Sequence, residues 1–254
     1  CPAMSNVLAV TSSSNPIEVE SFSKALGPAF TVSELELAPG SMYVSAEDDL
    51  IDALEGIVAV VLRTGELTER VIESADDLGI IAVHGSGYDH VDVDAATRNG
   101  VLVTHNPEAP GPAVIEHTVA MMITLLRRLP ERFERAAGGE WSRETVTELR
   151  QQTVGVVGLG YIGSRVARAV SETFGATVLG YDPYVTGELT SDIWPRVTRD
   201  EMESVGVEFV EWLDLFERSD IVTLHTALTD RTHEMVGMEE LEALEGDFLI
   251  NTAR

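Results

Sequence analysis

Three glycines, Gly158, Gly160 and Gly163, form a G-x-G-x-x-G motif between a strand-like apolar run and a helical pattern. At this spacing the first glycine permits a tight turn, the second lets the backbone approach a pyrophosphate, and the third lets the helix pack on the strand. The free N–H groups and the positive dipole at the start of that helix favour phosphate binding. The motif therefore predicts a dinucleotide site formed by Gly158, Gly160, Tyr161, Ile162 and Gly163.

An acidic residue, Asp182, follows the next strand-like run, nineteen residues after Gly163. A carboxylate at this position can accept hydrogen bonds from both ribose hydroxyls of NAD, and it repels the additional phosphate of NADP. Pro183 and Tyr184 come next, with no arginine within three residues to bind a 2′-phosphate. NAD is therefore the predicted cofactor.

Short apolar runs alternate with helical patterns along most of the chain, a pattern typical of parallel sheets that are covered on both faces. The sequence predicts an α/β fold of two lobes, each a parallel sheet with helices on both faces. The predicted strands are 6–10, 32–37, 57–62, 80–83, 101–104, 153–157, 177–181, 207–210, 221–225 and 247–250, and the predicted helices include 16–26, 46–54, 68–75, 113–128, 161–173, 212–218 and 238–244.

Three prolines and a glycine within residues 105–112 indicate a boundary between the lobes. We expect a first domain at 1–105 and a second at 106–254, joined through the helix at 113–128. The polar segment 131–150 has no clear core face. It is interpreted either as an arm that packs on a partner subunit or as a solvated loop and helix.

Composition excludes several classes of function. The 254 residues carry 43 acidic and 17 basic side chains, a net charge of −26, which repels nucleic acid. The sequence has no run of eighteen apolar residues, so it predicts no membrane span. Cys1 is the only cysteine, and no metal-ligand cluster is visible. Without a basic, apolar-centred leader, the expected compartment is the cytoplasm.

The balance of charge also predicts the salt concentration in which the protein works. All basic residues but Lys24 are arginine, and self-repulsion on this scale destabilises a compact state in dilute salt. Molar salt shortens the screening length to about 3 Å. We therefore expect the cytosol of an extreme halophile, haloarchaeal by composition; the alternative is an acidic protein of a mesophile.

Five blocks resemble the D-isomer-specific 2-hydroxyacid dehydrogenase family. They appear in family order and are His-Gly-Ser-Gly-Tyr-Asp-His-Val-Asp at 84–92, Val-Ile-Glu-His-Thr at 114–118, Val-Gly-Leu-Gly-Tyr-Ile-Gly at 157–163, Asn-Thr-Ala-Arg at 251–254, and a looser block at 224–232. In the looser block this chain has Ala227 where the family usually has proline. The resemblance implies a flavodoxin-like substrate lobe, a Rossmann NAD lobe and an active site in the cleft.

The resemblance also implies roles for the substrate-binding residues. The backbone N–H groups of Gly85, Ser86 and Gly87 would bind the substrate carboxylate, and two glycines after a buried strand do allow such a nest of exposed amides. Arg63 matches a position that often helps to bind substrate, and the alternative for Arg63 is an ordinary surface ion pair. Arg254 matches the catalytic arginine, which would hold the carboxylate and polarise the C2 carbonyl.

The implied activity is hydride transfer between NAD and C2 of a small D-2-hydroxy or 2-keto acid, with Thr226 and Thr252 along the nicotinamide half. We expect a homodimer, with Trp141 and segment 131–150 as candidate contacts. Two alternatives stay open. One is a non-enzymatic, NAD-sensing regulator of the C-terminal-binding protein type, and the other is phosphite dehydrogenase-like chemistry.

The family's catalytic glutamate and histidine follow the Asn-Thr-Ala-Arg block, at which this chain ends. We therefore expect a C-terminally truncated form of a longer enzyme, with both lobes incomplete and no turnover by itself. The histidines within the chain are interpreted as structural; they are His84, His90, His105, His117, His225 and His233.

Overall fold

The computed structural model describes residues 5–12, 16–37, 47–141, 143–190, 197–244, 246 and 248–253. The chain divides into two compact units, Cys1–Pro110 and Gly111–Arg254. We call them unit 1 and unit 2 and describe each by itself.

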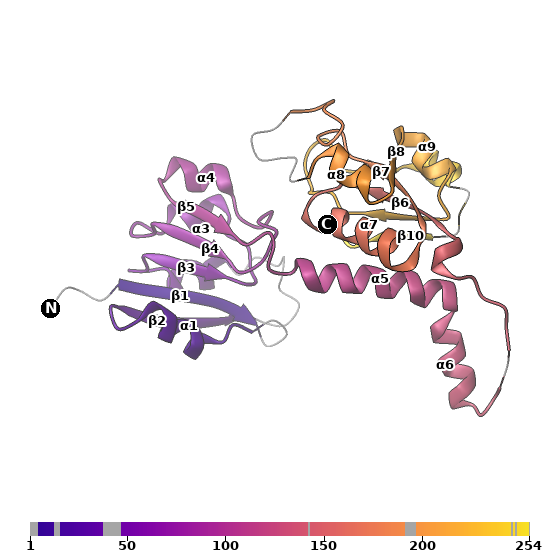
Figure 1. Ribbon diagram of the computed structural model, residues 1–254. Helices are drawn as coiled ribbons and strands as arrows, with labels where there is room; N and C mark the ends of the chain where they lie inside the picture. The colour runs from indigo at the N-terminus through magenta and orange to yellow at the C-terminus, as the bar shows by residue number, and fades with distance from the viewer. Residues whose placement is uncertain are drawn as a thin grey trace. The chain divides into compact units, whose positions relative to one another are not determined.

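Unit 1 is a five-stranded parallel sheet in the order β2-β1-β3-β4-β5 (Figure 1). This is the flavodoxin-like order, in which the chain reverses direction across the sheet between β1 and β3. Its elements are β1 Ser5–Ser12, α1 Val19–Leu26, β2 Phe30–Leu37, α2 Glu47–Ala53, β3 Ala59–Leu62, α3 Glu69–Glu73, β4 Ile80–Val83, α4 Val93–Arg98 and β5 Leu102–His105.

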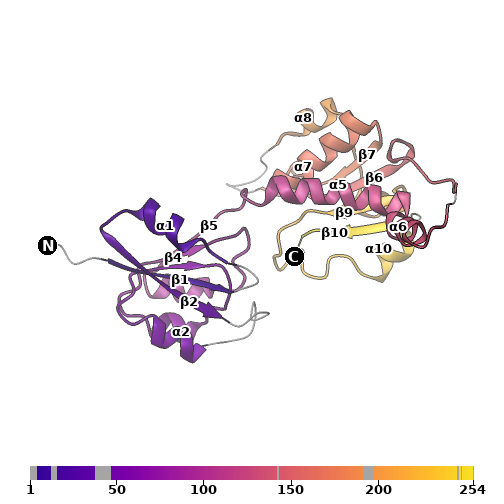
Figure 2. The same cartoon turned by 90° about the horizontal axis from the view of Figure 1, so that it is seen from below.

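Alternation along the strands gives unit 1 two apolar layers. Leu8 and Val10 of β1 face a cluster that includes residues of α2, α3 and α4, whereas Val7 and Ala9 face the cluster under α1. Successive strand side chains point to opposite faces, so both faces of β1 are buried. Helices therefore cover both sides of the sheet, as Figure 2 shows for α1 and α2.

Unit 2 is a second five-stranded parallel sheet, in the order β10-β9-β6-β7-β8. This order is that of a Rossmann sheet, and its switch point lies between β6 and β9, where the carboxyl ends of the strands form a ligand crevice. Its elements are α5 Gly111–Arg127, α6 Leu129–Ala137, η2 Leu149–Gln151, β6 Thr153–Val157, α7 Tyr161–Arg168, η3 Ala169–Thr173, β7 Thr177–Tyr181, α8 Arg199–Ser204, β8 Val207–Phe209, α9 Trp212–Glu217, β9 Ile221–Leu224, α10 Met238–Ala243 and β10 Phe248–Asn251.

The unit 2 sheet is covered on both faces by helices. Met122 of α5 and Val166 of α7 belong to one core cluster, with Val154 and Val156 of β6. Phe216 of α9 belongs to the other cluster, which includes residues of β7 and β9. The predicted α/β fold with two parallel sheets is confirmed.

The strands lie where the sequence predicted them, with shifts of one or two residues at their ends. Helix α1 begins three residues later than the predicted start at residue 16, and the predicted helix 161–173 continues from α7 into the π-helical η3. Helices α4 and α8 were not among the predicted elements. No helix in the described part of the chain has the length and apolar character needed to cross a membrane.

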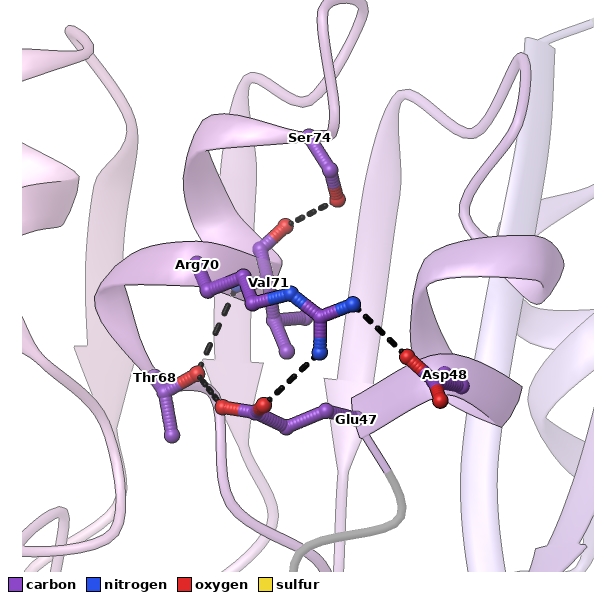
Figure 3. A network of polar contacts seen from close by, with 6 residues as sticks. All are labelled: Glu47, Asp48, Thr68, Arg70, Val71 and Ser74. Atoms are coloured by element: carbon purple, nitrogen blue, oxygen red, sulfur yellow. Dashed lines mark hydrogen bonds and ion pairs between the residues drawn. The ribbon is translucent and has the colours of Figure 1, made fainter.

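A polar network joins α2 to α3 on the surface of unit 1 (Figure 3). The Thr68 side chain accepts the N–H of Val71 at 3.5 Å, which caps α3, and its hydroxyl donates to Glu47 Oε1 at 2.5 Å. The Arg70 guanidinium bridges Glu47, at 2.9 Å, and Asp48, at 2.7 Å. These hydrogen bonds, first that from Thr68, lower the pKa of Glu47 below its ordinary value.

Candidate functional site

The glycine-rich loop of unit 2 is packed too tightly for side chains at two positions. Gly158 has a φ of 84°, and its N–H donates to Tyr181 O at 2.9 Å, which links the ends of β6 and β7. A Cβ on Gly158 would lie 3.0 Å from His225 O, and one on Gly163 would lie 1.9 Å from Gly158 O. The loop therefore lies against the carboxyl end of β9, and α7 starts directly on the loop.

The first turn of α7 offers four free backbone donors. No acceptor among the described residues binds the N–H groups of Gly160, Tyr161, Ile162 and Gly163, and the first helical hydrogen bond is Ser164 N to Gly160 O at 3.1 Å. Such a helix start, at a glycine-lined loop and at the carboxyl edge of the sheet, fits the pyrophosphate of a dinucleotide.

Tyr161 contributes to this site through its backbone, because its side chain is used for packing. The ring lies against the backbone of Gly111, where a Cβ would be 2.3 Å from Tyr161 Cε1. The Arg165 guanidinium lies 3.7 Å from the centroid of the same ring and donates to Tyr161 O at 2.9 Å. The ring thus holds the start of α7 against the start of α5.

Asp182 is a buried carboxylate, 9% exposed, that connects two loops of the cofactor edge. Its Oδ2 accepts the N–H of Leu159 at 2.7 Å, and its Oδ1 accepts those of Tyr184 at 2.9 Å and Val185 at 3.3 Å. A carboxylate has about four acceptor positions. Three of these positions are occupied, which leaves one, on Oδ2, for a ligand hydroxyl. The sequence led us to expect that the carboxylate binds both ribose hydroxyls.

Threonine hydroxyl groups lie beside both ring nitrogens of His225, next to the glycine loop, and we call this group the His225 chain. His225 Nε2 lies 3.0 Å from Thr223 Oγ1, and its Nδ1 lies 3.4 Å from Thr252 Oγ1, which in turn lies 3.2 Å from Thr118 Oγ1 on α5. Burial lowers the pKa of His225 to about 4. The imidazole is therefore neutral near pH 7, as a structural histidine should be.

Two threonines assigned to the nicotinamide half follow neighbouring strands, β9 and β10. Thr226 is half-buried, and its hydroxyl donates to Met235 Sδ at 3.7 Å, while its methyl group would lie 3.1 Å from a Cβ on Gly158. Thr252 belongs to the His225 chain. Thr118 was not singled out from the sequence, although it ends the block at 114–118.

In unit 1, the loop after β4 has its carbonyls held and its amides free. Arg63 Nη1 donates to His84 O at 2.7 Å, the N–H of Asn106 donates to Gly85 O at 2.9 Å, and His105 Nδ1 lies 2.8 Å from Ser86 O. The N–H groups of Gly85, Ser86 and Gly87 have no acceptor among the described residues. Three successive amides without an acceptor are what an anion-binding nest requires.

Arg63 therefore holds the loop, and its charge also acts on the neighbouring histidine. Partial burial, followed by the positive charge of Arg63, lowers the pKa of His84 below its ordinary value. A Cβ on Gly85 would meet nothing within 4 Å, and the φ of Gly85 is not left-handed. The fold itself does not require glycine at this position, so the open space above the loop is available to a ligand.

The structure brings the cofactor residues together within unit 2 and the substrate-loop residues together within unit 1. The predicted catalytic residue, Arg254, lies outside the described residues. Together, the Rossmann strand order, the amide-rich start of α7 and the acid after β7 define a dinucleotide-binding α/β protein.

Comparison with known proteins gives the family. The model of the NAD binding domain of D-isomer specific 2-hydroxyacid dehydrogenases matches residues 119–254. The D-3-phosphoglycerate dehydrogenase of Methanocaldococcus jannaschii is 34% identical over 228 residues, which are 88% of this chain and 40% of that protein. The glyoxylate reductase of Thermofilum pendens is 33% identical over 202 residues, which are 76% of this chain and 56% of that protein.

A solved structure agrees along nearly the whole chain. The D-lactate dehydrogenase of Aquifex aeolicus, complexed with NAD and lactic acid, has a TM-score of 0.79 and 30% identity, and the match covers 98% of this chain and 69% of that one. The chain therefore belongs to the D-isomer-specific 2-hydroxyacid dehydrogenase family, and the prediction of NAD as the cofactor is confirmed. It spans 40%, 34% and 38% of the length of three D-3-phosphoglycerate dehydrogenases that it matches.

Proposed function

We propose that the protein is an NAD-dependent oxidoreductase that transfers a hydride between nicotinamide C4 and C2 of a small D-2-hydroxy or 2-keto acid. The observation that carries this proposal is the group of free amides at the start of α7, directly above a glycine loop at the switch point of the unit 2 sheet. The names of the relatives, which are dehydrogenases and reductases, support hydride chemistry over a purely regulatory role.

In this proposal the cofactor residues bind and orient NAD, which supplies or accepts the hydride. The amides of residues 160–163 hold the pyrophosphate, and the remaining acceptor position of Asp182 binds one ribose hydroxyl. Thr226 and Thr252 border the nicotinamide half from the ends of β9 and β10. His225, with a pKa of about 4, does not donate the proton near neutral pH.

The substrate residues hold the acid. The three amides of Gly85, Ser86 and Gly87 bind its carboxylate, and Arg63 keeps their loop in place. Arg254 binds the carboxylate and polarises the C2 carbonyl, because a planar guanidinium can make paired hydrogen bonds and stabilise developing negative charge. By family resemblance, the proton that joins the C2 oxygen comes from a histidine beyond Arg254.

An absorbance assay tests the function. The full-length protein with NADH in molar KCl should consume NADH when hydroxypyruvate, glyoxylate, pyruvate or phenylpyruvate is added. The preferred acid identifies the substrate class. No consumption of NADH with any 2-keto acid, by protein that binds NADH, would contradict the proposed reaction.

Replacement of the arginine tests the proposed chemistry. Arg254→Ala in the full-length protein should reduce kcat by a factor of about 10²–10³, the usual effect of removing one donor from a developing oxyanion. Arg127→Ala is a control for the loss of an arginine that is exposed at the last residue of α5 and has no proposed role. A near-normal rate for Arg254→Ala would remove this residue from the catalytic role.

We also propose a homodimer in which α6 and the segment after it contact the second subunit. No residue of α6 is buried, Phe133 is 66% exposed and Trp141 is 87% exposed. Figure 1 shows α6 projecting from the end of α5, away from the unit 2 sheet. Light scattering should give a dimer for the full-length protein and a larger monomer fraction for the pair Phe133→Ser and Trp141→Ser; an unchanged dimer would exclude this interface.

A further inference from the structure

Residues at the ends of both neighbouring strands hold the loop at residues 84–87 by hydrogen bonds to its carbonyl groups, and these bonds fix the direction of its amides. In a planar trans peptide the C=O and N–H groups point in opposite directions. The held carbonyls of His84, Ser86 and Gly85 belong to the same peptide units as the amides of Gly85, Gly87 and Ser86, respectively. Each hydrogen bond to a carbonyl therefore turns one amide outward.

His105 provides one of these three hydrogen bonds from the end of β5. It lies opposite Val83 in the β4–β5 register, directly before the loop begins. Its Nδ1 is 2.8 Å from Ser86 O, and because a carbonyl only accepts, Nδ1 carries the proton. The Tyr88 ring meets the imidazole edge-on, with centroids 4.9 Å apart and an interplanar angle of 66°.

From this geometry we propose that His105 is a positioning residue that orients the Ser86–Gly87 peptide, so that the N–H of Gly87 faces the substrate carboxylate. The proposal rests on the proposed function, in which the amides of residues 85–87 bind that carboxylate. Arg63 and the N–H of Asn106 have the same effect on the two preceding peptides. His105 does not touch the substrate and acts through the backbone of Ser86.

His105 is exposed, so its replacement leaves the core of unit 1 intact. His105→Ala removes the hydrogen bond to Ser86 O and the contact with Tyr88. His105→Asn is the matched control, because the amide nitrogen of asparagine occupies a position close to that of Nδ1 and still donates. The thermal unfolding of all three proteins should be compared first, and it should differ little.

The test is a titration with oxalate of the full-length, ¹⁵N-glycine-labelled protein, which is first saturated with NAD. Oxalate has two carboxylates but no ketone or aldehyde carbon that could be reduced. In the wild type the amide signals of Gly85 and Gly87 should shift saturably. In His105→Ala the shift of Gly87 should be lost and oxalate should bind about tenfold more weakly, the usual effect of one hydrogen bond. The signal of Gly85, which Arg63 orients, should still shift, and His105→Asn should restore both effects.

The outcomes separate this inference from the proposed function. Equal Gly87 shifts and equal affinity in wild type and His105→Ala would overturn the role of His105 and leave the loop as the substrate site. Failure of His105→Asn to restore binding would show that the Nδ1 hydrogen bond is not the cause. If oxalate moves neither signal in the wild type, the loop does not bind carboxylate, and both proposals fail.

Discussion

Asp182 has a structural role, and we propose that the same carboxylate also binds a ligand. It holds the glycine loop through Leu159 and the turn after β7 through Tyr184 and Val185. These contacts leave about one acceptor position of the carboxylate for a ligand. The sequence predicted the acid and its position, because a strand followed by an acid is a local pattern. The contacts from Tyr184 and Val185 are local, two and three residues after the acid. The sequence did not show that the N–H of Leu159 also binds the carboxylate, because this contact depends on how β6 and β7 pair.

Replacement of Asp182 should therefore have two separable effects. Asp182→Ala should destabilise the protein by about 1–3 kcal/mol, since buried N–H groups lose their acceptor, and it should weaken NAD binding and narrow the preference over NADP. Asp182→Asn keeps one carbonyl oxygen, so we expect more of the stability to remain while the charge that repels a 2′-phosphate is lost. Thermal unfolding and the Kd values of both cofactors measure the two effects, and an unchanged NAD preference in both variants would exclude Asp182 from selectivity.

His225 should make the stability depend on pH. Its pKa falls from 6.5 to about 4 in the folded state because of burial. Both states are neutral above pH 6.5; as the pH falls below 6.5, the unfolded chain takes up a proton that the folded protein does not. The free energy of unfolding should therefore decrease between pH 6.5 and 4, by up to about 3 kcal/mol from this residue.

His225→Gln is the control for this pH effect, since glutamine does not titrate. Denaturant unfolding at fixed molar KCl should show a shallower decrease below pH 6.5 for the variant than for the wild type. Parallel pH profiles would mean that His225 takes up a proton equally in both states. The sequence could not predict this environment, because Thr252, which contacts His225, is 27 residues away in the chain, and Thr118, which contacts Thr252, is 107 residues away from His225.

At the scale of elements, the short helices show where the sequence pattern was too weak. Helix α8 has one buried residue, Met202, so it has almost no apolar periodicity. The signal that identifies it is its capping box, in which Thr198 Oγ1 accepts the N–H of Glu201 and Glu201 accepts that of Thr198. The strands were predictable because buried parallel strands are continuous apolar runs.

The cap of α3 leads to a prediction at the same scale. Thr68→Ala should destabilise unit 1 by about 1 kcal/mol, as expected for loss of an N-cap side chain. Because the hydrogen bond from Thr68 is the largest cause of the low pKa of Glu47, that pKa should rise toward its ordinary value in the variant.

Carboxyl NMR titration of Glu47 and thermal unfolding measure these two changes in the network that Figure 3 shows. Thr68→Ser keeps the hydroxyl and should behave like the wild type in both measurements. A Glu47 pKa that is unmoved in Thr68→Ala would assign the effect to Arg70 alone.

At the scale of the whole molecule, the main feature is the excess of negative charge. The chain has 43 acidic residues against 17 basic ones, and exposed arginines such as Arg168 and Arg199 already pair with neighbouring glutamates. The excess of acids therefore repels itself, and the Debye length of about 8 Å at physiological salt screens this repulsion only in part.

Added salt should therefore stabilise the fold. Between 0.1 and 3 M KCl the Tm should rise by roughly 10 °C, since a few kcal/mol shift the Tm of a chain of this size by that amount. Calorimetry measures the rise, and NaCl should act like KCl if screening is the cause. A Tm independent of salt would contradict an origin in a saline cytosol.

We propose that the amides at the start of α7 bind the pyrophosphate of NAD, and a crystal structure of the full-length protein with NAD is the decisive test. We expect phosphate oxygens within hydrogen-bond distance of the N–H groups of residues 160–163, and one ribose hydroxyl on Asp182 Oδ2. A dinucleotide bound elsewhere, or a pyrophosphate that does not touch these amides, would contradict it.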